Sequence, residues 1–167
     1  SLFKQHVQLY HERVAHRVSE AQKIIWRVRR LGVFVKQKDL ADDGLRKEMI
    51  AKLPADEVAR KDVELLLEGY DLAVKQTREM KRRLIELMHD FVLFDGGVKK
   101  LPRVHQYFGV KAAQAQVHQK KGGIIWHTQG SGKSIVMVLL AKWILENNPN
   151  ARVTIITDRD ELDKQIE

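Results

Sequence analysis

A short run of glycine, lysine and serine residues offers the clearest chemistry in the sequence. Gly130, Gly132, Lys133 and Ser134 form the end of the pattern G-x-x-x-x-G-K-[S/T]. Glycines let successive backbone N–H groups converge on one anion, because no side chain blocks its approach. The lysine then pairs with the β- and γ-phosphates of a nucleotide, and the serine hydroxyl binds the bridging Mg²⁺. The pattern predicts a phosphate site at a helix N-terminus, with Lys133 and Ser134 nearest to the chemistry.

The first position of this pattern is occupied by His127 instead of glycine, and a glycine-rich surface turn is the alternative interpretation. The flanking sequence favours the phosphate loop. An apolar run precedes it, and the seven residues 135–141, all apolar, follow it. A helix that is apolar on every side is covered on every side, as between a parallel sheet and a further layer. We therefore expect parallel strands at 123–126 and 152–157, with a helix after the loop that ends near Asn147.

Composition is that of a globular protein. The chain has 167 residues, of which 44% are hydrophobic, enough for one domain or one domain and part of a second. It has no cysteine, which excludes disulfides and thiolate metal sites. No apolar run is long enough to span a bilayer, so we expect a cytoplasmic location and no membrane partner. The first residue is Ser1 and not methionine, which suggests a piece of a longer protein.

The formal charge of +8 suits a polyanionic partner, although solvated basic faces are common. Three clusters of basic residues could contact a phosphate backbone. They are Arg27, Arg29 and Arg30; Lys81, Arg82 and Arg83; and Lys99, Lys100 and Arg103. For each cluster taken alone, a solvated basic face is the simpler interpretation.

The N-terminal half has the periodicity of long helices. Apolar residues recur every three or four positions over 3–31 and again over 63–91. A shorter helix is expected at 45–53, before Pro54. Ala55 and Asp56 then open the second long helix, in which Gly69 is a candidate interruption. Two long amphipathic helices joined by a turn pair most simply as an antiparallel hairpin, which has no chemistry of its own.

A break follows the second long helix. Asp95, Gly96 and Gly97 end it, and the basic stretch after them contains Pro102. We predict a helical region at 1–95, a linker at 96–103 and a nucleotide-binding lobe that begins at 104. A helix at 104–117 is expected to lead to the first strand. The predicted fold class is α/β, in which a partial parallel sheet follows a long helical hairpin.

Three stretches of sequence are shared with one family. They read Arg-Val-His-Gln-Tyr-Phe at 103–108, Ile-Ile-Trp-His-Thr-Gln-Gly-Ser-Gly-Lys-Ser at 124–134, and Ile-Ile-Thr-Asp-Arg-Asp-Glu-Leu-Asp-Lys-Gln at 155–165. They resemble the motor region of the restriction (R) subunit of type I restriction enzymes, within helicase superfamily 2. Trp-His-Thr before Gly-Ser-Gly-Lys is typical of that family. The resemblance covers roughly 84–167 and implies the N-terminal part of a RecA-like P-loop NTPase lobe at 104–167.

The resemblance also implies roles for individual residues. Gln106 matches an upstream glutamine whose amide reads the adenine edge, which implies ATP; without the resemblance, a surface glutamine is the simpler interpretation. Arg159, Leu162 and Gln165 match a segment that lies along the DNA backbone. Ser134 would bind Mg²⁺. The matched phosphate loop comprises Thr128, Gln129, Gly130, Ser131, Gly132, Lys133 and Ser134.

In that family, ATP hydrolysis drives translocation along double-stranded DNA before cleavage, together with methylation and specificity subunits. The acidic pair that holds Mg²⁺, the arginine finger, the second motor lobe and the nuclease pattern are absent from these 167 residues. We therefore expect this chain alone to bind nucleotide poorly and hydrolyse little. Two other interpretations remain open. One is a P-loop phosphotransferase, although about 120 residues precede the loop here; the other is a helical interaction module with a vestigial phosphate loop.

Overall fold

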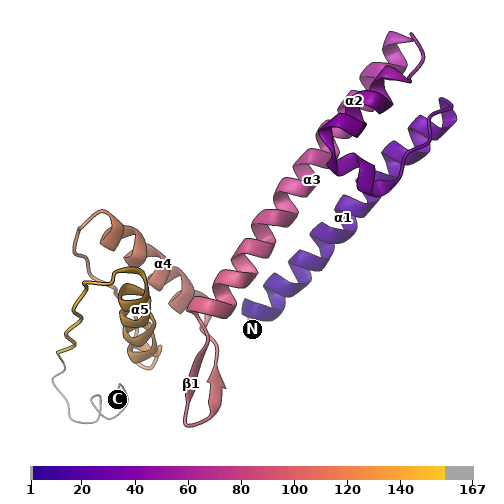
Figure 1. The fold of residues 1–167 in the computed structure, drawn as a ribbon. Helices are drawn as coiled ribbons and strands as arrows, with labels where there is room; N and C mark the ends of the chain where they lie inside the picture. The colour runs from indigo at the N-terminus through magenta and orange to yellow at the C-terminus, as the bar shows by residue number, and fades with distance from the viewer. Residues whose placement is uncertain (1, 157–167) are drawn as a thin grey trace. The chain divides into compact units, whose positions relative to one another are not determined.

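The computed structural model describes residues 2–156, which are mostly helical (Figure 1). None of the helices in this range has the length and apolar character needed to cross a membrane. Contacts divide the chain into a unit of residues 6–83 and a unit that combines residues 1–5 with 84–167. The elements in chain order are α1 (Leu2–Arg30), the 3₁₀ helix η1 (Gln37–Ala41), α2 (Asp43–Ala51), α3 (Glu57–Asp90), β1 (Leu93–Asp95), β2 (Val98–Lys100), α4 (Val104–His118) and α5 (Lys133–Asn147).

The two long helices form the predicted antiparallel hairpin. Arg13 of α1 accepts a hydrogen bond from the Thr77 hydroxyl through its carbonyl oxygen (3.2 Å), and Arg27 pairs with Asp62, so the two helices run in opposite directions. Gly69 does not interrupt α3. It lies where α1 comes close, because a Cβ at this position would sit 3.3 Å from a carboxylate oxygen of Glu20.

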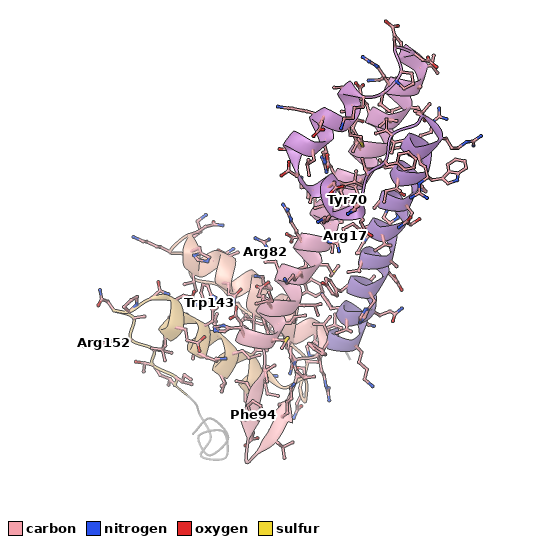
Figure 2. The ribbon with its side chains drawn as sticks, turned by 45° about the vertical axis from the view of Figure 1, so that its right-hand side comes forward. Arg17, Tyr70, Arg82, Phe94, Trp143 and Arg152 are labelled. Atoms are coloured by element: carbon pink, nitrogen blue, oxygen red, sulfur yellow. The ribbon has the colours of Figure 1, made fainter. Side chains whose placement is uncertain are left out.

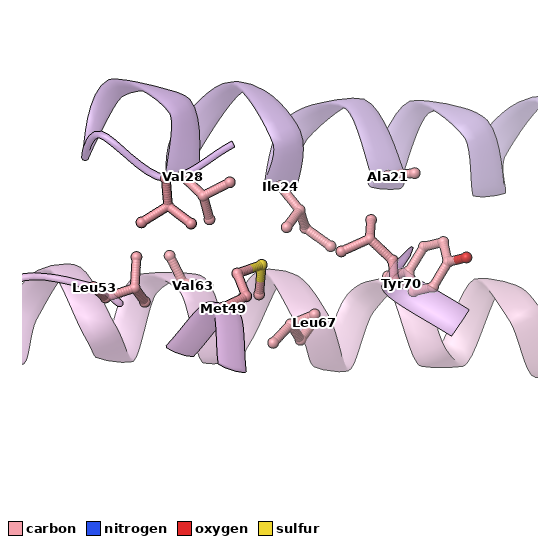
Figure 3. Close-up of a cluster of buried hydrophobic side chains, with 10 residues drawn as sticks. Ala21, Ile24, Val28, Met49, Leu53, Val63, Leu67 and Tyr70 are labelled. Carbon is pink, nitrogen blue, oxygen red and sulfur yellow. The ribbon is translucent and has the colours of Figure 1, made fainter. Parts of the chain in front are cut away.

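Apolar side chains between these helices make the core of the unit 6–83 (Figure 3). Helix α2 and the segments around it cover one side of the hairpin with Leu40, Met49 and Leu53. Ile24, Val28 and Val63 have no exposed surface. The buried members are Ala21, Ile24, Val28, Val33, Leu40, Met49, Leu53, Val63, Leu67 and Tyr70.

Helix α2, predicted at 45–53, is held at its N-terminal end by polar contacts. Asp42 caps its N-terminus, since its carboxylate accepts a hydrogen bond from the backbone N–H of Leu45 at 2.9 Å. Arg46 forms a bidentate ion pair with Asp71 of α3, in which two guanidinium nitrogens donate to the two carboxylate oxygens at 3.0 and 2.7 Å. These hydrogen bonds raise the pKa of Arg46, against the opposing effect of burial.

A β-hairpin that was not expected from the sequence follows α3. Leu93 pairs with Lys100 and Asp95 with Val98 in an antiparallel register. Gly96 and Gly97 both have positive φ, +55° and +80°, as a two-residue type I′ turn requires. Gly96 and Gly97, predicted to break the helix and to begin a linker, therefore connect two short strands.

Helices α4 and α5 pack on the end of α3 in the second unit. The ring of Phe91, the residue after α3, lies 4.8 Å from the ring of Tyr107 of α4. Lys111 of α4 pairs with Glu86 of α3. The buried apolar residues of this unit are Leu2, Leu87, Phe91, Tyr107, Val110, Val136 and Leu139.

The predicted parallel strands are wrong for the described residues. Residues 123–126 and 152–156 form no regular secondary structure, and residue 157 lies outside the described range. Ile124, Trp126 and Ile156 are 91%, 89% and 90% exposed. A strand needs a neighbour to bond its N–H and C=O groups, and residues 2–156 offer these segments none. Within residues 2–156 the sheet of the expected α/β lobe is thus not formed, and this part of the chain is helical with one hairpin.

The helix after the loop is covered on one side only, unlike the prediction. In α5 the buried residues are Val136, Leu139 and Trp143, which recur every three or four positions. Leu145 is 53% exposed, and most of the other apolar residues of α5 are half-buried. The second layer that the apolar sequence of α5 demands would have to come from the sheet that is missing here.

Candidate phosphate-loop site

The loop before α5 has the backbone of an anion site. Gly130 and Gly132 both adopt left-handed conformations, with φ of +73° and +78°. The N–H of Ser131 bonds to the carbonyl of Thr128 at 3.3 Å, which closes a tight turn. Helix α5 then begins at Lys133, and no side chain caps its N-terminus. Its first N–H groups are available for an anion, as a phosphate loop requires.

Gln106 reaches this loop from α4, 25 residues earlier in the chain. Its side chain is 2% exposed, and its Nε2 donates to the carbonyl oxygens of Ser131 (3.0 Å) and Gly132 (3.1 Å). Its Oε1 accepts from the N–H of Arg103 at 2.7 Å. Every part of the amide is therefore engaged with backbone groups, so in this conformation Gln106 holds the loop and presents nothing to a base.

The ammonium of Lys133 lies over the loop. Its Nζ donates to the carbonyls of Thr128 (3.2 Å) and His127 (3.4 Å), while the side chain stays exposed to solvent. Carbonyl oxygens here take the place that phosphate oxygens would have in a nucleotide complex. Ser134 follows in the first turn of α5 and is half-buried.

Two polar atoms at this site are buried without a hydrogen bond. They are the Ser131 hydroxyl and Nδ1 of His127. Buried polar groups are nearly always satisfied, so unpaired ones beside a loop indicate an arrangement that a ligand or a rearrangement would complete.

Two histidines at the loop were not assigned a role from the sequence. Nε2 of His105 lies 3.0 Å from the carbonyl of Ser131, and its ring meets that of His127 edge to face, with centroids 5.2 Å apart. His127 packs against Gly109 of α4, where a Cβ would come within 3.2 Å of its Nε2. For His127 the signals were the irregular first position of the motif and the Trp-His-Thr run of the resembled family. His105 lies in the shared stretch 103–108, but nothing in the sequence indicated its contact with the loop.

The structure thus brings together most of the predicted site residues. The loop itself contains Thr128, Gln129, Gly130 and Gly132, and Gln129 is exposed. Gln106 and Lys133 both contact the loop through hydrogen bonds to its carbonyl oxygens. Arg159 and Gln165, predicted to contact DNA, lie outside the described residues.

Together, the loop and the helix that follows it resemble the loop-and-helix part of a P-loop NTPase site. Comparison with known proteins points the same way. The profile of the SWI2/SNF2 ATPase family matches residues 105–167, a range that includes both Gln106 and the loop.

Relatives of the chain are endonuclease subunits of type I restriction enzymes. The HindI subunit of Haemophilus influenzae is 35% identical over 97 residues, which are 50% of this chain and 9% of that protein. The putative MjaIXP subunit of Methanocaldococcus jannaschii is 35% identical over 100 residues, 52% of this chain and 9% of that protein. The matches confirm the resemblance inferred from the three shared stretches. They span about a tenth of each relative's length. No solved structure matches the chain.

Proposed function

We propose that this chain carries the ATP-binding part of the motor of a type I restriction endonuclease R subunit. ATP hydrolysis there would drive translocation along double-stranded DNA before the DNA is cut. The observation that carries the proposal is the convergence of Gln106, Lys133 and two left-handed glycines on one loop at the start of α5. The match of this same stretch to an ATPase family supports it.

In the proposed site, the chain contributes binding and charge. The Lys133 ammonium would leave the carbonyls of His127 and Thr128 for the β- and γ-phosphates of ATP. The free N–H groups of the loop and the first turn of α5 would bind the remaining phosphate oxygens. A neutral side chain in place of Lys133 would leave the negative charge of the phosphates uncompensated.

The loop also fits a Mg²⁺ ion. Mg²⁺ keeps several waters and needs one or two protein oxygens in addition to phosphate oxygens, and Ser134 supplies one such oxygen at the start of α5. The bound ion would neutralise charge between the β- and γ-phosphates.

The proposed partners are DNA and the methylation and specificity subunits of the restriction–modification complex. Arg159 and Gln165 are proposed to contact the DNA backbone. The division into a helical region at 1–95, a linker at 96–103 and a motor lobe from 104 onward is part of the same proposal, and so is the RecA-like completion of that lobe.

Substitution of Lys133 by alanine in the full-length protein tests the proposal. DNA-dependent ATP hydrolysis should fall by about 100-fold or more, as when a positioned charge-stabilising group is removed. Lys142→Ala is the matched control, because Lys142 lies on the same helix and bonds to the carbonyl of His89. Wild-type hydrolysis by Lys133→Ala would show that this loop is not the ATP site.

A further inference from the structure

A groove of about 880 Å³ lies within the unit 6–83. It is lined by one face of α3, by Arg17 of α1, and by residues of η1 and α2. Three of the lining residues, Arg17, Tyr70 and Arg82, are labelled in Figure 2. Half of the lining side chains are basic: Arg17, Arg46, Lys75, Arg78, Arg82 and Arg83.

The acidic residues of the groove are already matched to some of these bases. Asp71 pairs with Arg46. Glu79 pairs with Arg82 and Arg83, and their hydrogen bonds lower the pKa of its carboxyl group. The remaining acid, Asp43, attracts the Arg46 guanidinium and helps to raise its pKa.

Three of the basic side chains have no acidic partner. Within the described part of the chain, Arg17, Lys75 and Arg78 make no ion pair, and Nε of Arg17 is buried without a hydrogen bond. The groove therefore has an excess of positive charge that the protein itself does not compensate.

Two of these unpaired side chains, Lys75 and Arg78, lie in a row with Arg82, which pairs with Glu79. Lys75, Arg78 and Arg82 are spaced three and four residues apart, so they share one face of α3 and extend over about 10 Å of helix. Phosphates of one DNA strand repeat every ~3.4 Å along the duplex axis, so this row spans roughly three of them. A single small anion would need donors that converge on one point, whereas a row of cations suits a chain of phosphates.

The groove offers no surface for base stacking. Its aromatic residue, Tyr70, is 5% exposed, and the guanidinium of Arg46 lies 5.5 Å from its ring centre. Proteins that bind single strands usually stack bases on exposed aromatic rings. We infer that this groove binds the sugar-phosphate backbone of double-stranded DNA, without reading its sequence.

This second DNA contact rests on the proposed function only for the choice of DNA as the polyanion. It also changes the interpretation of Arg82 and Arg83, two members of the basic cluster 81–83 for which the sequence alone favoured a solvated face. The fold adds Arg17 from α1 and Lys75 and Arg78 from the preceding turns of α3, and so combines scattered charges into one surface.

The test is binding of the full-length protein, without nucleotide, to a duplex of about 30 base pairs of arbitrary sequence over a range of salt concentrations. The variant is Lys75→Gln with Arg78→Gln. Both side chains are exposed and unpaired within the described residues, so the fold should be unaffected. The control is Lys38→Gln with Lys81→Gln, which removes the same charge from exposed positions outside the groove.

The groove variant should bind the duplex at least about tenfold more weakly at 0.1 M salt, and its log–log salt slope should fall by about 2, while the control changes neither. Equal losses in variant and control would reduce the effect to net charge and overturn the inference. So would unchanged binding, or a loss seen with single-stranded DNA or duplex RNA but not with duplex DNA. Lys133→Ala separates the two proposals, because it should abolish ATP binding and leave duplex binding through the groove intact.

Discussion

Gly132 is constrained in two ways at once. Its φ of +78° is costly for a residue with a side chain, and a Cβ at this position would collide with Nε2 of Gln106. The same backbone conformation that turns the chain into α5 also leaves room for the glutamine that holds the loop. A single residue thus links the geometry of the phosphate site to α4.

Substitution of Gly132 by alanine should therefore weaken ATP binding strongly. The left-handed backbone alone would cost about 1–2 kcal/mol, and Gln106 would lose its bonds to the loop. Gly122→Ala is the control, since Gly122 has no atom within 4 Å of a Cβ position and no positive φ. Equilibrium ATP binding by the full-length variants measures the difference. Equal affinity in both would contradict the constraint on Gly132.

Substitution of Gln106 distinguishes two possible roles of this residue, reading the adenine base and holding the loop. If its amide leaves the loop to read adenine, Gln106→Ala should reduce the preference for ATP over GTP by at least about tenfold, because guanine presents the reversed donor and acceptor pattern. Competition between the two nucleotides measures this preference. If both affinities fall by the same factor, Gln106 only holds the loop, as its present contacts show, and the adenine assignment is wrong.

At the scale of elements, the sequence predicts those helices and loops that depend on residue spacing and on local motifs. The bounds of α1 and α3 follow from three- and four-residue spacing and from the turn at Pro54, and they agree with the structure within a few residues. The helix expected at 104–117 is found as α4. The phosphate loop follows from a local motif. The contact between Gln106 and the loop carbonyls depends on how α4 packs, so spacing alone could not give it. The hairpin was missed because three-residue strands carry too little alternation to detect.

The wrong strand predictions have a different cause. Residues 123–126 have the composition of a buried strand, but a strand is formed only with its neighbours. Composition predicts what a segment would do in a complete sheet. It does not say whether the other strands are present.

Core packing between α1 and α3 should determine the stability of the unit 6–83. Ile24 is fully buried there, so Ile24→Ala should lower the free energy of unfolding by about 2–5 kcal/mol. Leu72→Ala on α3 is the control, because its side chain is 56% exposed, and it should change this free energy by less than about 0.5 kcal/mol. Denaturant titration of the chain, followed by helical circular dichroism, measures both. Comparable losses would mean that the interface between the helices differs from the one described.

For the molecule as a whole, stability should be uneven. Residues of α1 and α3 at 14–28 and 74–87 are enclosed in helices, whereas 124–126 and 155–156 are mostly exposed and have no regular backbone hydrogen bonds. Hydrogen exchange of this chain should therefore be slow in the first two segments and close to that of an unstructured peptide between 124 and 156, outside α5. Uniformly strong protection would show that the sheet is completed, for example by a second copy of the chain.

The central claim, that ATP hydrolysis at this loop drives movement along DNA, is tested most directly by displacement of a third strand bound to the duplex. The full-length protein, assembled with its methylation and specificity subunits, should displace that strand after a lag that grows with its distance from the loading site. Lys133→Ala should bind the same DNA and displace nothing. Displacement by Lys133→Ala at the wild-type rate, or a wild-type lag independent of distance, would contradict the account.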